Sequence, residues 1–396
     1  MSNRTSLASL NWLHTIALVM LPLGALMILP WIHAHRATIW FMLGYGYLRG
    51  FAITAGYHRL WAHRAYTART PLKLALAILG AGAAQDSIKK WCRDHRAHHR
   101  YVDTDKDPYN IQKGFFYAHM GWILFEEGHG VQTTGRVDIS DLKSDPIVQW
   151  QSRNHLFLAL LVGYVAPTVI CGLCFEDFLG GFVFAGCLGT ALQQQVAFCV
   201  NSVAHWAGTQ PYGAGKTPRD HVLTGILTLG EGYHNFHHEF PIDYRNGVRW
   251  HDFDPTKWVI WICYQIGLVT NLRRFPQNEI EKGRLQQRRA KLDKEYETVD
   301  WGVPLAELPV MKWEEYKQQA RTGCNLIVIG AAVHDVSAFV TEHPGGPAMI
   351  TGAIGKDATE MFGGGMYRHS NAASNLLHRM RIARIEKKVN LASGED

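Results

Sequence analysis

Charged residues are few in this chain of 396 residues, and its excess of positive charge is small. Asp, Glu, Lys and Arg make up 19% of the residues, and the formal net charge is only +6. A nucleic-acid-binding domain gathers basic residues on one face or along one helix, and this chain carries no such footprint. We therefore expect no nucleic-acid partner.

The sequence also gives no sign of disulfide bonds or of a cleavable leader. The seven cysteines do not form a disulfide framework. Cys171 and Cys174 make a C-x-x-C motif, but it lies in the apolar run L-L-V-G-Y-V-A-P-T-V-I-C-G-L-C, where thiols serve as small hydrophobic groups. The first apolar run of the chain continues beyond a normal signal-peptide h-region and lacks a clear cleavage site, so we expect no cleavable signal peptide.

Apolar residues are plentiful, and they are bunched. Hydrophobic residues make up 47% of the chain, although the mean hydropathy of −0.11 resembles that of a soluble protein. A helix needs roughly 20 apolar residues to cross a bilayer core. Four runs approach this length, and four such runs disfavour the alternative of buried helices in a soluble core. They lie at about 11–32, 38–56, 155–174 and 178–199.

Short loops join these runs into two hairpins. The loops at 33–36 and 175–177 are very short, whereas the segment 57–154 between the hairpins is rich in Lys and Arg. Basic flanks stay in the cytosol. The sequence therefore predicts that the N-terminus, the segment 57–154 and everything after the fourth run share the cytosolic side of a multi-pass membrane protein.

The rest of the chain divides into three parts. A shorter apolar set at 258–269, followed by N-L-R-R, predicts an interfacial helix. Residues 278–298 read as a charged helix, and a compact soluble module begins at about 314. We expect a membrane domain at 1–275, a helical linker at 276–313 and a small α+β domain at 314–390, in a mainly α-helical protein.

The pattern H-x-x-H-H occurs twice, far apart in the sequence. Residues at i, i+3 and i+4 share one face of a helix, and the predicted topology puts both copies on the cytosolic side. Two further histidines, in H-R-L-W-A-H, have a spacing that suits a turn or helix end, and another closes the fourth run. One copy alone would suit a solvated basic face. Nine imidazoles suit two metal ions with an open position on each, and imidazole fits Fe, Zn or Cu. They are His58, His63, His95, His98, His99, His205, His234, His237 and His238.

The three boxes H-R-L-W-A-H, H-R-A-H-H and H-N-F-H-H resemble those of the membrane acyl-CoA desaturases of the stearoyl-CoA type. The neighbouring W-C-R-D-H, D-T-D-K-D-P-Y and D-Y-R-N-G strengthen the resemblance. It implies four membrane spans under a cytosolic cap that holds two iron ions. The nine histidines would be the ligands, and Asn201 matches an asparagine that acts through a water.

The resemblance also implies substrate contacts. Trp91, Arg93 and Asp94 match the substrate-contacting motif and are expected to line the site for a fatty acyl-CoA. After H-M-G-W-I-L, however, this chain has F-E-E-G-H-G, so that Glu126 and Glu127 stand where the family has basic residues for the CoA phosphates.

A second motif, H-D-V-S-A-F-V-T-E-H-P-G-G-P, resembles the core of cytochrome b5. The resemblance implies haem b with His343 and His369 as its axial ligands. His334 departs from the pattern, because the family usually has Tyr there. A module with two axial histidines has no open position for oxygen at the haem, so it would carry electrons. Its place at the C-terminus matches the fungal type, whereas front-end desaturases carry the module first.

Together these features predict a Δ9-class acyl-CoA desaturase of the endoplasmic reticulum membrane. It would use O2 to introduce a cis double bond into a saturated fatty acyl-CoA, with electrons from NADH–cytochrome b5 reductase passed through the fused module. Carboxylate pairs or a serine nucleophile would not help, because a mid-chain methylene offers no acid–base handle. Two alternatives stay open. They are a di-iron membrane hydroxylase, which would make an alcohol, and a non-catalytic haem- and metal-binding membrane protein.

Overall fold

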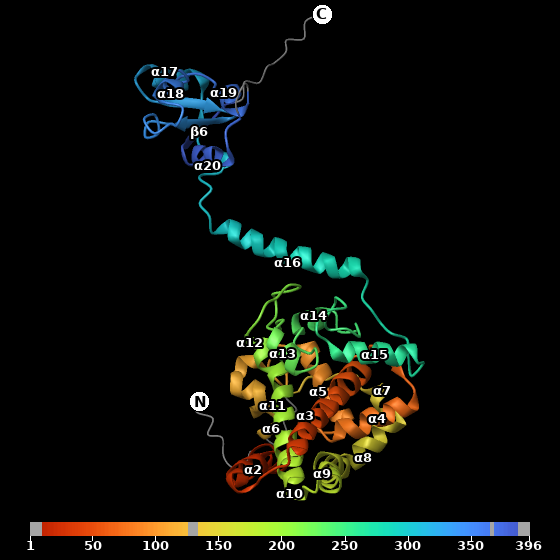
Figure 1. Cartoon of the computed structure of the whole chain (residues 1–396). Helices are drawn as coiled ribbons and strands as arrows, with labels where there is room; N and C mark the ends of the chain where they lie inside the picture. Colours follow the sequence, from red (N-terminus) through yellow and green to blue (C-terminus); the bar gives the residue numbers. More distant parts are fainter. Residues whose placement is uncertain (1–9, 126–133, 365–367, 387–396) are drawn as a thin grey trace, which may run out of the picture. The chain divides into compact units, whose positions relative to one another are not determined.

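The computed structural model describes residues 10–125, 134–364 and 368–386. The described chain is mainly helical and separates into two units, residues 1–290 and 291–396 (Figure 1). The expected fold class, a helical membrane protein with a small sheet-containing C-terminal module, is confirmed. Glu126 and Glu127 lie outside the described residues.

Three helices of the described chain are long and apolar enough to cross a membrane, which confirms three of the predicted spans. They are Trp12–Trp31, Pro146–Phe175 and Phe178–Trp206. Each contains π-helical or 3-10 turns, labelled η, and the third has a turn residue at Ser202. The segments are α1 (Trp12–Thr15), η2 (Ile16–Met20), α2 (Leu21–Ile28) and η3 (Leu29–Trp31); α8 (Pro146–Leu160), η7 (Leu161–Val165) and α9 (Ala166–Phe175); α10 (Phe178–Gly180), η8 (Gly181–Leu188), α11 (Gly189–Asn201) and α12 (Val203–Trp206).

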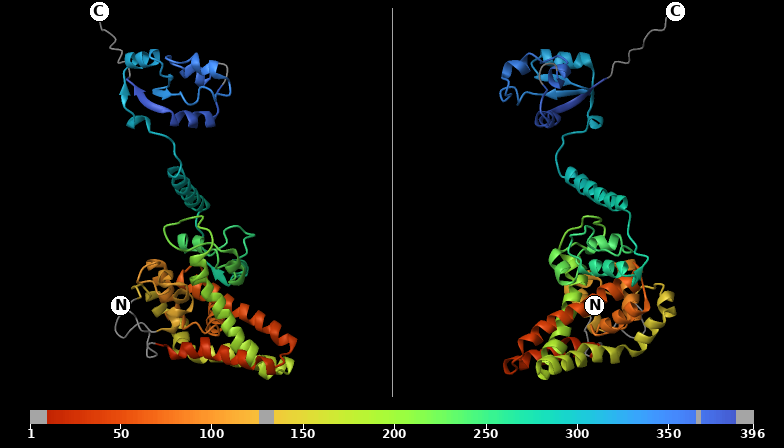
Figure 2. Two further views of the ribbon diagram at one scale, coloured as in Figure 1. Left: turned by 90° about the vertical axis from the view of Figure 1, so that its left-hand side faces the viewer. Right: turned by 45° about the vertical axis from the view of Figure 1, so that its right-hand side comes forward.

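The run at 38–56 is also helical, as α3 (Arg36–Phe51) and η4 (Ala52–Ala62), but it is not among the helices that are apolar enough to span. The expectation that this run also is long and apolar enough to span is therefore not confirmed. Arg49 lies on α3, fully buried, and its Nη1 donates to the carbonyl oxygens of Gly82 and Gly163 and to the hydroxyl of Thr190. α3 packs beside η8 and α11 (Figure 2), so this helix belongs to the bundle. The charge of Arg49 is buried inside the bundle.

Short elements over the bundle form a cap that carries most of the histidines. Strand β1 (Thr67–Ala68) pairs antiparallel with β2 (Val269–Thr270), which ties the start of α4 to the end of α15. The predicted interfacial helix is α15, which exposes Trp261 and Ile262, and Ile266 just after the helix is also exposed. The cap helices are α4 (Thr70–Ala81), α5 (Ile88–Tyr101), η5 (Ile111–Lys113), η6 (Tyr117–Gly121), α6 (Trp122–Leu124), α7 (Ser140–Ser144), α13 (Val222–Leu227), α14 (His234–Glu239) and α15 (Pro255–Gln265).

The charged segment after the cap is helix α16 (Gln277–Glu297), and the second unit begins within it. That unit contains a four-stranded sheet in the order β3-β6-β5-β4, in which only the β3–β6 pair is parallel. Buried Tyr316, Leu326 and Val333 pack on one face of the sheet. Its elements are η9 (Leu305–Glu307), β3 (Val310–Met311), α17 (Trp313–Arg321), β4 (Leu326–Ile329), β5 (Ala332–Asp335), α18 (Pro347–Thr351), α19 (Thr359–Gly363), α20 (Asn371–Arg379) and β6 (Arg381–Ile385).

Candidate metal centre

The first histidine pair sits on a π-helix. η4 is buried along its whole length, and the backbone N–H of His63 donates to the carbonyl oxygen of His58 across five residues. A π-helix joins backbone groups five residues apart by hydrogen bonds, and the two rings lie 4.7 Å apart between centroids. The gap in H-R-L-W-A-H therefore matches the hydrogen-bond spacing of this π-helix. His63 caps its C-terminus, which confirms the expected helix end.

Each H-x-x-H-H triplet is divided between two groups of ring nitrogens. On α5, His95 and His99 face one group, whereas His98 faces the other. On α14, His237 joins His95 and His99, whereas the other two histidines join His98. Within each group the ligand nitrogens all lie within 4.8 Å of one another. The five-histidine cluster is His58, His63, His95, His99 and His237, and the four-histidine cluster is His98, His205, His234 and His238.

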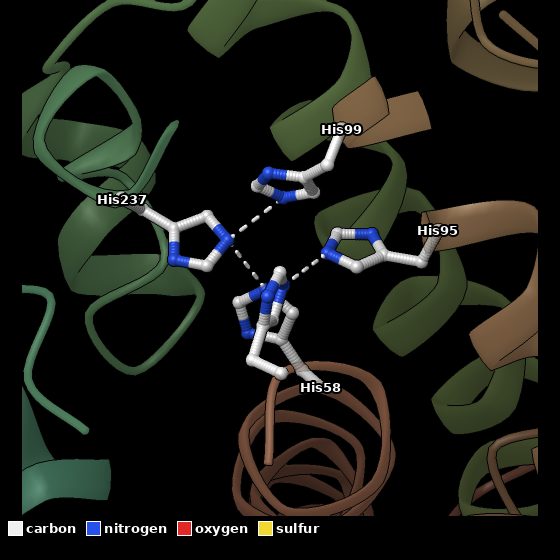
Figure 3. Close-up of side chains that lie close together, drawn as sticks. His58, His95, His99 and His237 are labelled. Atoms are coloured by element: carbon white, nitrogen blue, oxygen red, sulfur yellow. Dashed lines mark hydrogen bonds between the residues drawn. The ribbon is translucent and has the colours of Figure 1, made fainter. Parts of the chain in front are cut away.

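The ring nitrogens of the five-histidine cluster turn toward a common centre (Figure 3). Nε2 of His237 lies 3.0 Å from Nε2 of His58 and 3.0 Å from that of His99, and Nε2 of His63 lies 2.8 Å from Nε2 of His95. The four-histidine cluster is arranged in the same way. Its Nε2 atoms are separated by 3.2 Å between His98 and His238 and by 3.0 Å between His205 and His234.

The chemistry of this donor set fits metal ions. Burial lowers the pKa of six of the clustered histidines well below its usual range, and the neighbouring imidazoles lower it further. This holds for His63, His95, His99, His234, His237 and His238. Neutral imidazoles present lone pairs, and lone pairs that converge at such distances need a cation or shared protons between them.

A cavity of about 290 Å³ runs between α3 and α11 and ends at the five-histidine cluster, where His58 and His95 form part of its wall. Its other walls are mostly apolar, and Gly46, Gly50 and Gly189 leave room along its length. Asn201, the last residue of α11, also lines it. The space therefore suits a linear hydrocarbon chain that is held with one part beside the histidines.

The three residues expected at the substrate site are placed differently from one another. Trp91 lines the cavity and stacks on the ring of His95, with centroids 4.9 Å apart. Arg93 instead pairs with the buried carboxylate of Asp94 at 2.6 Å, and neither of the two lines the cavity. Burial raises the pKa of Asp94, and Arg93 offsets only part of this rise.

Glu231 is a site residue that the sequence analysis did not single out. Its Oε2 lies 2.8 Å from Nδ1 of His58, although the oxygen stands off the direction in which the ring N–H points. Its Oε1 accepts from the Arg59 guanidinium, which also pairs with Asp254, the residue that caps α15. Burial acts to raise the pKa of Glu231, but His58 and Arg59 outweigh it and hold the pKa at about 2. Only its place beside the histidines in E-G-Y-H-N-F-H-H could have indicated from the sequence that Glu231 belongs to the site.

The second unit brings two histidine rings close to one another, with their planes tilted by 39°. The ring centroids of His343 and His369 are 6.5 Å apart. Nδ1 of His343 lies 3.3 Å from the carbonyl oxygen of Gly346, and Nδ1 of His369 lies 3.0 Å from that of Phe362. A carbonyl only accepts, so each Nδ1 carries the proton and Nε2 is the nitrogen with a lone pair for a metal. His334 is buried on β5.

These features define an integral membrane protein with a histidine-rich metal centre and a separate module with two histidine rings close to one another. Residues 33–272 match the model of the family "Fatty acid desaturase", and residues 312–386 match "Cytochrome b5-like Heme/Steroid binding domain". The chain therefore belongs to the fatty acid desaturase family, and its C-terminal domain implies haem.

Two relatives that match almost the whole of this chain are fungal. The chain is 47% identical over 374 residues to "Probable acyl-CoA desaturase" of Schizosaccharomyces pombe, an alignment that covers 94% of this chain and 77% of the relative. It is 43% identical over 390 residues to "Acyl-CoA desaturase 1" of Saccharomyces cerevisiae, covering 97% and 75%. "Stearoyl-CoA desaturase 5" of Homo sapiens is 36% identical over 275 residues, covering 68% and 83%.

Proposed function

We propose that this chain is an acyl-CoA desaturase that introduces a cis double bond, at Δ9, into a saturated fatty acyl-CoA. The observation that carries the proposal is the apolar cavity that ends at His58 and His95. In the balanced reaction the acyl chain loses two hydrogens, and O2 takes these together with two electrons and two protons to give two waters. Acyl-CoA desaturase is also the printed name of both fungal relatives.

The nine clustered histidines would hold two iron ions, with Asn201 acting through a water. When bound, iron would supply the oxidising power that breaks an unactivated C–H bond. The side chains of this protein have the complementary task of positioning. The walls on α3 and α11 exclude water and hold the chain extended, Trp91 fixes the ring of His95, and the substrate methylene must come to rest beside that ring.

His343 and His369 would hold haem b, which would supply one-electron transfer. We propose NADH–cytochrome b5 reductase as the source of these electrons. The proposed domain boundaries are 1–275 for the membrane domain, 276–313 for the linker and 314–390 for the haem domain. Fusion raises the effective concentration of the carrier at the metal centre. We place the protein in the endoplasmic reticulum membrane, with the cap and the haem domain cytosolic.

The test is expression in cells that lack their own desaturase, followed by analysis of their fatty acids. We expect cis-unsaturated chains with the double bond at carbon 9 from the wild-type chain and none from a His95→Ala variant. A hydroxylated product would favour the hydroxylase alternative. An unchanged fatty-acid profile, with no oxygen-dependent oxidation of NADH, would favour a non-catalytic protein. A double bond at another carbon would overturn only the Δ9 assignment.

A further inference from the structure

The segment D-T-D-K-D-P-Y at residues 103–109 has no role in the function described so far, yet it lies against the four-histidine cluster. Nδ1 of His98 lies 2.9 Å from Oδ1 of Asp107, and both groups are buried. The backbone N–H groups of Tyr109 and Asp103 also donate to Asp107, one to each oxygen. Asp107 is thus an acceptor toward every partner, so His98 donates from Nδ1 and its Nε2 lone pair faces the cluster.

A second arm of the same segment reaches His205. The hydroxyl of Thr217 lies 2.8 Å from Nδ1 of His205 and donates its own hydrogen to Oδ1 of Asp103. The backbone N–H of Thr217 donates to the other oxygen of Asp103 at 2.8 Å. A hydroxyl has one hydrogen to give. Because Asp103 takes it, Thr217 accepts from His205, and the Nε2 lone pair of His205 also faces the cluster.

The backbone conformation of Asp103 allows both hydrogen-bonded links, to His98 through Asp107 and to His205 through Thr217. Asp103 has φ of +66°, in the left-handed region that few residues other than glycine adopt. In this conformation its N–H reaches Asp107 at 3.1 Å while its carboxylate reaches Thr217. Non-glycine residues in this region cost free energy and persist where surrounding contacts determine them. Asp105, in the same segment, is exposed.

We propose that Asp107 and, through Thr217, Asp103 are positioning residues for the four-histidine cluster. His98 and His205 come from different helices, α5 and α12, whereas His234 and His238 share α14. The segment 103–109 links the two isolated rings into one frame and fixes the tautomer of each. Partners of this kind raise the affinity of a histidine site for its metal, and their loss typically costs 10- to 100-fold.

The test measures metal in the purified full-length chain, so it has a readout besides activity. The variants are Thr217→Val, which keeps the shape but removes the hydroxyl, and Thr217→Ser, which keeps the hydroxyl. Asp107→Ala removes the other arm, and Asp105→Ala is the matched control. Each is loaded with Fe(II) alone and passed over a weak chelator. The unfolding midpoint of the metal-free chain is measured in parallel, because a merely structural residue would move that quantity.

The wild-type chain, Thr217→Ser and Asp105→Ala are expected to retain about two iron ions. Thr217→Val is expected to retain about one, with affinity at the weakened site lower by about 10- to 100-fold and an unchanged midpoint without metal. Asp107→Ala should lose the same ion. Two tightly held ions in Thr217→Val, or an equal loss of iron in Thr217→Ser, would overturn this inference but leave the proposed metal centre intact. The inference rests on the proposed metal centre, so a wild-type chain that binds no iron would overturn both.

Discussion

His99 and His238 stack on one another, with ring centroids 4.1 Å apart and ring planes 9° from parallel. They belong to different clusters, and they are the least buried members of each. The two metal sites therefore meet at one pair of parallel rings rather than lying in separate pockets. This contact makes the nine histidines a single structural unit, and the first prediction depends on it.

Removal of one ring at this junction is expected to affect both sites. In His238→Ala the four-histidine cluster loses a ligand, and the ring of His99 loses its stacking partner. We expect the bound iron to fall by more than one ion per chain and desaturation to fall to background. Elemental analysis of the purified protein measures this, with the exposed His251→Ala as control. A loss of one ion, with the other site unchanged in affinity, would show that the clusters are independent.

The glycines on α3 are expected to set how long a chain the cavity admits. A Cβ at Gly46 would meet only the carbonyl oxygen of Gly189, at 3.9 Å, so a larger side chain can be accommodated without shifting the helix. Gly46→Leu would fill part of the cavity and shift the products toward shorter acyl chains. Gly44→Leu, on the same helix but exposed and outside the cavity, is the control. Chain lengths by gas chromatography are the measurement, and identical profiles for the two variants would contradict the assignment.

The salt bridge between Arg96 and Asp141 predicts a pH dependence of stability. Burial acts to raise the pKa of Asp141, but two hydrogen bonds and the charge of Arg96 lower it overall. Because the folded pKa lies below the unfolded value of about 3.9, the stabilisation is present at neutral pH. It is lost as the pH falls below about 4 and through the folded pKa.

Asp141→Asn tests this dependence. It is expected to lower stability by about 1 kcal/mol at neutral pH, a modest amount because Asp141 is partly exposed. The difference between wild type and variant should shrink below about pH 4. Thermal unfolding in detergent over a series of pH values measures it, with Asp105→Asn as the control. A difference that stays constant across the series would mean that the charge of Asp141 contributes nothing.

Electron supply through the second unit predicts a partial rescue. His343→Ala removes one of the two neighbouring rings, so the haem absorbance of the purified chain should be lost and desaturation in cells should fall sharply. A separate cytochrome b5 supplied in excess should restore part of the activity, because it replaces the lost carrier but lacks the effective concentration that fusion provides. Full activity of His343→Ala without any other cytochrome b5 would show that the module is not the donor.

The nature of the site could be predicted from the sequence, but its internal arrangement could not. The spacing of His95, His98 and His99 placed three rings on one side of α5. Which ring faces which cluster depends on how α5 crosses η4 and α14, and that is a tertiary contact. The helix end at His63 was predicted correctly, but the π-helical turns before it were missed because π-helices are rare.

The residues that hydrogen-bond to the histidine ligands could likewise not be predicted from the sequence. Thr217 lies 114 residues from Asp103 along the chain, and nothing near Thr217 marks it as a partner of His205. Arg49 was overlooked for a different reason. The run around it was interpreted as a span from its many apolar residues, although the arginine decides what the helix must contact.

Arg49 also has a consequence for how the protein is made. An arginine at the centre of a membrane helix costs about 2.5–3.5 kcal/mol when the helix inserts by itself. In the finished bundle the guanidinium is bound by carbonyl oxygens of Gly82 and Gly163 and by Thr190, which are made later in synthesis. The helix that carries Arg49 therefore leaves the ribosome before its partners exist. We expect it to stay at the translocon until the hairpin of α9 and α11 arrives, so that biogenesis of the protein depends on the hairpin that follows.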